Sequence, residues 1–171
     1  MHRPKSSLLF IPLFLLQCFL GANAQEPKLP APIPSQIAAA QKVFISNHGG
    51  DSFKTVIDQT VFSGGPDRPY NQFYAAIRSW GKYEVVSAPS DADLIFQIGW
   101  HLTGSEMRLD LAQLQLVIID PKTKTELWTL NEFVRGAHLL SNRDKNFDQA
   151  MNMLVTRLKK LVQPQEPMKQ P

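Results

Sequence analysis

Apolar residues recur along this chain with two periods, one typical of helices and one typical of strands. Across residues 70–80 they fall three and four positions apart, Asp67 stands at the N-cap position, and Gly81 ends the pattern. A second stripe of helical period covers residues 147–161. A polar loop, 136–145, is expected to precede it. The sequence therefore predicts two main helices.

Other segments alternate between apolar and polar residues, which is typical of strands buried on one face. The turn 120–124 predicts a hairpin, so the strands on either side of it should pair antiparallel. The aspartates at 91 and 93 are interpreted as structural turn residues. Segment 56–62 could be a short strand or a turn of helix. Strands are predicted at 42–46, 83–87, 94–101, 111–119 and 126–134.

The order of these elements predicts an α+β fold. We expect a single mixed, mostly antiparallel sheet of four to five strands, with the two main helices packed on one face. The domain should span residues 35–162, after a proline-rich linker at 25–34 and before a disordered tail at 163–171.

The first 24 residues have the organisation of a secretory signal peptide. Arg3 and Lys5 form a basic start, residues 8–20 are apolar but too few to span a bilayer, and residues 22–24 fit a cleavage site. The sequence therefore predicts an exported protein, periplasmic or secreted, with no membrane span after cleavage. Acylation of Cys18 is the less favoured alternative, because the residues just before it are not small.

Charge and cysteine content limit the possible partners and the possible sources of stability. The whole chain has a net charge of +3, and removal of Arg3 and Lys5 with the leader leaves 16 basic against 15 acidic side chains. That balance, without a basic block, argues against nucleic acid as a partner. The only cysteine, Cys18, lies in the leader, so the exported chain would have no disulfide and would depend on its core.

A resemblance appears in the core and turn residues. Residues 92–96 follow a strand that ends at 85–87, and a later strand runs into the turn 120–123 and then Leu127 and Trp128. This pattern resembles small exported bacterial envelope proteins of unknown function, and more broadly the TolB amino-terminal domain and CsgG-like periplasmic α/β modules. The resemblance implies a fold and a compartment. It implies no role for any residue.

The glycine-rich segment 47–67 is the predicted recognition site, since it places polar side chains where a core does not need them. Because such a segment should be exposed, joint replacement of its residues 48 and 51 and of Arg68 by alanine is expected to leave stability nearly unchanged. The candidate ligand-binding or partner-binding residues are Asn47, His48, Asp51, Ser52, Asp67 and Arg68.

No catalytic residue, metal ligand set or cofactor motif is predicted. The histidines lack the spacing of a metal site, and Ser52 near His48 has no nucleophile elbow around it. The favoured function is a non-enzymatic envelope module that binds another envelope protein through the glycine-rich segment or a sheet edge. A small hydrolase and a small-ligand carrier that use this segment are the alternatives.

Overall fold

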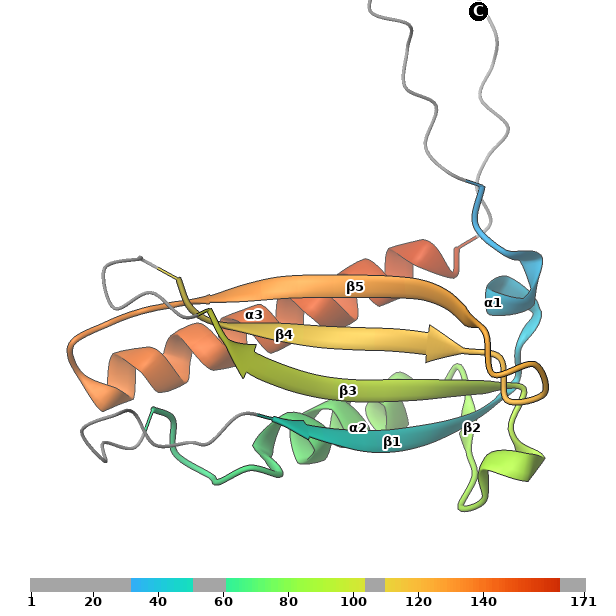
Figure 1. The fold of residues 1–171 in the computed structure, drawn as a ribbon, viewed down its shortest axis with the longest axis horizontal. Helices are drawn as coiled ribbons and strands as arrows, with labels where there is room; N and C mark the ends of the chain where they lie inside the picture. The colour runs from blue at the N-terminus through green and yellow to red at the C-terminus, as the bar shows by residue number, and fades with distance from the viewer. Residues whose placement is uncertain (1–31, 51–60, 104–109, 164–171) are drawn as a thin grey trace, which may run out of the picture. The chain divides into compact units, whose positions relative to one another are not determined.

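A computed structural model describes residues 32–50, 61–103 and 110–163, and within them a five-stranded sheet has the order β2-β1-β3-β4-β5 (Figure 1). β1 runs parallel to β2 and β3, whereas β3, β4 and β5 are antiparallel. The predicted α+β class is confirmed. The elements are α1 (Ser35–Ala39), β1 (Lys42–Gly50), α2 (Arg68–Trp80), β2 (Glu84–Val85), the 3₁₀ helix η1 (Pro89–Asp91), β3 (Leu94–Leu102), β4 (Asp110–Ile119), β5 (Glu126–Arg135) and α3 (Leu140–Leu161).

The core lies between one face of the sheet and the layer formed by α2 and α3 (Figure 1). Alternate residues of the central strands are buried there, as period-two alternation requires. Phe73 of α2 packs edge-on against Phe96 of β3 with ring centroids 6.2 Å apart, and Leu154 of α3 is fully buried. The residues that β3 and β4 contribute are Leu94, Phe96, Ile98, Trp100, Ala112, Leu114, Leu116 and Ile118.

Helix α2 forms as the sequence predicts, and its C-cap Gly81 has φ 70°, a left-handed conformation that glycine adopts without strain. Helix α3 begins earlier than predicted, at Leu140 rather than after residue 145. The prediction was wrong because the polar residues 141–145 were assigned to a loop. In the structure they form the first turns of α3, and the backbone N–H of Asn142 and Arg143 donate to Leu139.

Two strands differ from their predicted lengths. β2 has two residues in place of the five predicted at 83–87. β1 continues to Gly50, so the glycine-rich segment begins inside the sheet rather than after it. Asp93 fastens this end of the sheet, because its Oδ2 accepts the backbone N–H of Gln41 and of Lys42, each at 2.9 Å. Its interpretation as a structural residue fits that geometry.

The leader, most of the linker and nearly all of the tail lie outside the described residues, and their assignments stay predictions. The same holds for residues 56–60, the part of the undecided segment that precedes Val61. Within the described part of the chain, no helix has the length and apolarity needed to cross a bilayer.

Candidate functional site: the open face of the sheet

The predicted site residues do not form one exposed loop. Asn47 and His48 lie in β1, Asp67 holds the N-cap position of α2, and Asp51 and Ser52 lie outside the described residues. Asp67 makes no capping hydrogen bond through its side chain. Its Oδ1 instead accepts a 2.8 Å hydrogen bond from Nδ2 of Asn47, which ties the start of α2 to β1.

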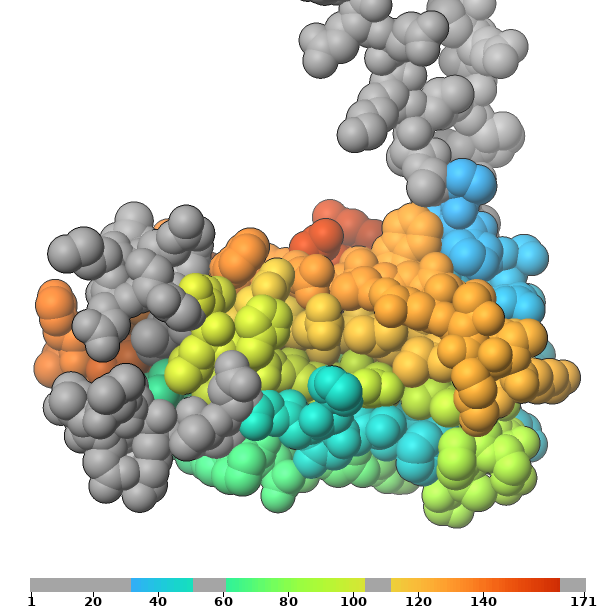
Figure 2. Space-filling view, viewed as in Figure 1, coloured from blue at the N-terminus to red at the C-terminus, as the bar shows by residue number. Residues whose placement is uncertain are grey.

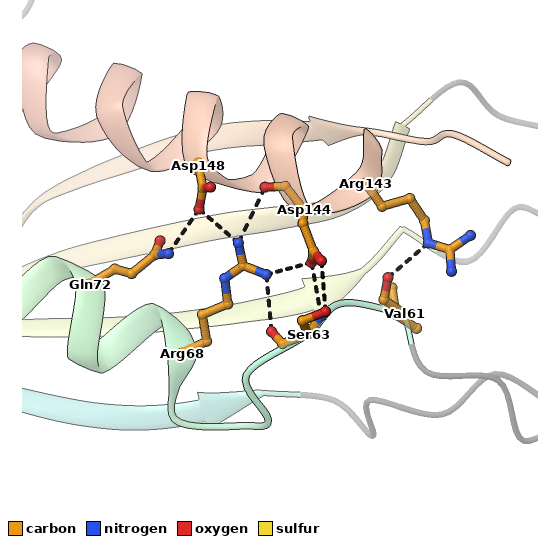
Figure 3. A network of polar contacts seen from close by, with 7 residues as sticks. All are labelled: Val61, Ser63, Arg68, Gln72, Arg143, Asp144 and Asp148. Carbon is orange, nitrogen blue, oxygen red and sulfur yellow. Dashed lines mark hydrogen bonds and ion pairs between the residues drawn. The ribbon is translucent and has the colours of Figure 1, made fainter. Parts of the chain in front are cut away.

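Arg68 lies at the centre of a polar network between α2 and α3 (Figure 3). Its side chain is only 10% exposed, and its guanidinium lies 4.4 Å above the ring centre of Phe147. Nη1 donates to Oδ1 of Asp144 at 2.6 Å, and Nη2 donates to Oδ1 of Asp148 at 2.7 Å. Gln72 also donates to Asp148, at 2.8 Å. The expectation that Arg68 is an exposed loop residue is therefore wrong.

The same network also bonds the segment that leads into α2. Ser63 donates to Asp144 twice, from its backbone N–H and from its hydroxyl, and Arg143 donates to the carbonyl of Val61 (Figure 3). Burial acts to raise the pKa of Asp144, but the hydrogen bonds from Ser63 and the Arg68 guanidinium outweigh it and lower the pKa. We therefore interpret this network, which we call the helix clamp, as structural.

A β-bulge shapes the opposite face of the sheet. The register between β1 and β3 shifts between Asn47 and Gly49, and Gly49 has φ 76°. Bulges are rare between parallel strands and are over-represented next to functional sites, where they redirect a side chain. Here the bulged residue is His48, whose Nδ1 contacts the carboxamide of Gln97 on β3.

Beside the bulge lies a hollow of about 310 Å³ at one end of the sheet. Its lining includes the imidazoles of His48 and His101, the carboxamide of Gln115 and the backbone of three glycines. A side chain at Gly99 would be crowded, since its Cβ would lie 3.0 Å from the carbonyl oxygen of Gly49. The structure thus brings together two histidines, 48 and 101, that lie far apart in sequence.

The hollow belongs to a larger surface, the face of the sheet turned away from the helices, which we call the open face. Figure 2 views this face, on which β1, β3, β4 and β5 lie side by side. Its central positions, among the described residues, carry no Asp, Glu, Lys or Arg. They are Phe44, Ser46, Ile95, Gln97, Gly99, His101, Gln113, Gln115, Val117, Ile119, Thr129, Asn131 and Phe133.

Charged side chains appear where the strands end. Lys42, Glu84, Glu126 and Arg135 are all exposed and lie at strand ends. Glu126 also continues the row of Ile119 on β5, and its carboxylate accepts a hydrogen bond from the hydroxyl of Thr129. An uncharged centre with a charged rim is the pattern of protein interfaces, whose cores are depleted of charged residues.

The edge of the sheet at β5 is less suited to binding. Arg157 of α3 donates to the carbonyl of Asn131 at 2.6 Å, and Asn146 donates to the carbonyl of Arg135 at 2.9 Å. A carbonyl that already accepts a hydrogen bond is less available to an added strand. Contacts from α3 therefore favour the open face over this edge.

Three observations on the described residues bear on the hydrolase and carrier alternatives. Ser63 donates to a carboxylate rather than to an imidazole, so it is not activated as a nucleophile. Within residues 32–50, 61–103 and 110–163, no three His, Cys, Asp or Glu side chains are grouped as metal ligands. The lining of the hollow is polar, whereas a carrier of apolar ligands needs an apolar pocket.

Comparisons with known proteins return structures of low similarity. The sequence matches no protein-family profile and no curated protein. The PelC dodecamer from Paraburkholderia phytofirmans is 12% identical, with 78% of this chain and 94% of that chain covered and a TM-score of 0.45. A DUF330 protein from Xanthomonas campestris is 14% identical (72% and 84% covered, TM-score 0.44). A lipoprotein from Neisseria meningitidis is 15% identical (71% and 97% covered, TM-score 0.37).

Similarity at this level carries no argument about function. The resemblance to the TolB amino-terminal domain and to CsgG-like modules, inferred from the sequence, stays a prediction. The function has to be argued from the chain's own surface.

Proposed function

We propose that this chain is an exported, non-enzymatic binding protein of the bacterial cell envelope, and that its open face contacts another envelope protein. The observation that carries the proposal is the distribution of charge over the sheet. An ordinary solvent-facing sheet mixes charged residues among its polar ones. The open face instead places carboxamides, hydroxyls and apolar side chains at its centre, and the charged side chains lie at strand ends.

Export is the second part of the proposal, and it is supported by the predicted leader at residues 1–24. Mass spectrometry of the protein recovered from the exported fraction tests it. A chain that begins at Gln25 is expected. An intact leader, or a chain that begins with an acylated Cys18, would contradict it.

The contact surface can be tested in intact cells with a photo-crosslinking amino acid placed at Gln115, on β4 of the open face. A matched probe at Gln149 lies on the exposed side of α3. We expect a discrete protein adduct from position 115 and none from position 149. The adduct should disappear when Gln97→Glu introduces a charge beside the probe, because the desolvation of a charge opposes its burial in an interface.

Two results would overturn the assignment of the surface. One is an adduct at position 149 with none at position 115. The other is an adduct at position 115 that persists undiminished in the Gln97→Glu chain. Circular dichroism of each variant checks that its fold is intact.

A further inference from the structure

We infer that the protein bound by the open face is a second copy of this chain, in a face-to-face homodimer. The inference rests on the proposed function, because it names the partner of the same surface. It follows from three properties of that surface, namely its hydrogen-bonding chemistry, its apolar rows and its area.

The hydrogen-bonding chemistry is self-complementary. Gln97, Gln113 and Gln115 each have a carboxamide, which contains both a donor and an acceptor, so a copy of the same group can pair with it. A face of carboxylates or of ammonium groups would repel its own copy. A two-fold interface buries the same patch on both partners, and such a patch must be compatible with itself.

Apolar residues supply the packing that a sheet-on-sheet contact needs. Phe44, Ile95 and Ile119 lie in one row across β1, β3 and β4, and Val117 lies in the next row. All four are half-buried, although none of the helices in the described part of the chain covers this face. Two sheets that meet through such rows pack about 10 Å apart, with their strands within about 30° of each other.

The area of the open face suits a reversible dimer. The four strands are nine or ten residues long, and with a spacing of about 4.8 Å and a rise of about 3.3 Å per residue they cover about 600 Å² of surface. Two copies would bury about 1,200 Å² in total, at the lower limit for specific interfaces. We therefore expect a dimer whose population depends on protein concentration. The contacts of Arg157 and Asn146 with carbonyls of β5 favour this face-to-face contact over pairing through the β5 edge.

The test uses charge pairs at the centre of the face. Gln97 and Gln115 lie on the two middle strands of the four, β3 and β4, so a two-fold arrangement centred there brings them close to their counterparts. One variant carries Gln97→Glu with Gln115→Glu, and a second carries Gln97→Lys with Gln115→Lys. The matched control carries Gln149→Glu with Gln163→Glu, at exposed positions of α3 and just after it.

Sedimentation equilibrium of the exported chain measures the result. The natural protein and the control should form dimers with equal affinity. Each charged variant should dimerise at least about tenfold more weakly, since like charges meet across the interface. An equimolar mixture of the glutamate and lysine variants should recover the dimer, because opposite charges then face each other. Recovery by mixing requires contact between two copies, so a merely unfolded variant would not show it.

Several results would overturn the inference. They are a natural protein that stays monomeric at millimolar concentration, charged variants that dimerise undiminished, and folded variants whose mixture does not recover. Thermal unfolding of each variant establishes that it is folded. A monomeric protein that still gives a hetero-adduct from position 115 in cells would refute the homodimer and leave the proposed function standing.

Discussion

Replacement of Arg68 by alanine should destabilise the domain by about 3 kcal/mol, although the sequence predicts almost no effect. The magnitude follows from the contacts of the guanidinium. A hydrogen bond to a charged group contributes about 1.5–3 kcal/mol, and the bond to Asp144, whose side chain is 22% exposed, belongs in this range. The ion pair with Asp148, 52% exposed, adds about 0–1 kcal/mol. The contact with Phe147 adds about 0.5–1 kcal/mol.

Urea denaturation followed by circular dichroism measures this free energy of unfolding. Arg78→Ala is the matched control, because Arg78 is an exposed arginine of the same helix. Its change should stay below about 0.5 kcal/mol. Arg68→Lys should fall between the natural chain and Arg68→Ala, since lysine keeps the charge but cannot donate to two carboxylates through a rigid fork.

A double-mutant cycle with Asp144→Ala measures the interaction energy between Arg68 and Asp144, apart from the contacts that each makes with other residues. The double variant should lose less stability than the two single variants together, by about 1–3 kcal/mol. Strictly additive losses would show that Arg68 and Asp144 do not act as a pair. A loss below about 0.5 kcal/mol for Arg68→Ala would refute the helix clamp as a structural element.

Three further predictions concern the core, the pH dependence and the bulge. Leu154→Ala should cost about 2–5 kcal/mol, and an unchanged urea midpoint would show that α3 is not docked. The pKa of Asp93 is lowered, first by the backbone hydrogen bond from Gln41, so its contribution is present above its unfolded pKa and is lost as pH falls through its folded pKa. Urea midpoints should therefore fall below about pH 4 in the natural chain and less steeply in Asp93→Asn. Gly50→Ala should lower the melting temperature because its Cβ would meet the indole of Trp100, and an unchanged melting temperature would contradict that packing.

The sequence predicts the elements whose signals are local. The apolar period of α2 and its terminal Gly81 place that helix correctly, and alternation places β3 and β4 within one residue at each end. The sequence did not predict the start of α3, because the first turns of this helix are polar and contact other polar groups. A polar segment without an apolar period has the same sequence pattern as a loop. Arg143 and Asp144 could not be assigned without knowing that they meet residues 61–68.

The open face could be predicted in part from the sequence. Alternation already places Gln113, Gln115 and Val117 on one side of their strand. The absence of charged residues from these alternate strand positions was the signal from which the open face could have been predicted. The neighbourhood of His48 and His101 was not predictable, because it depends on β1 lying beside β3 and on a bulge that no local pattern predicts.

The two polar regions of this domain, the helix clamp and the open face, differ in whether their side chains need a bonded partner to be stable. The helix clamp uses full charges, and these are stable in a partly buried place only while Arg68 and Asp144 remain paired. The open face uses neutral carboxamides, which can exchange water for a partner at small cost and return to water when the partner leaves. Stability and binding should therefore separate by mutation. Arg68→Ala should lower the melting temperature while the folded fraction still associates. Like charges at Gln97 and Gln115 should weaken association at least about tenfold while the melting temperature changes little.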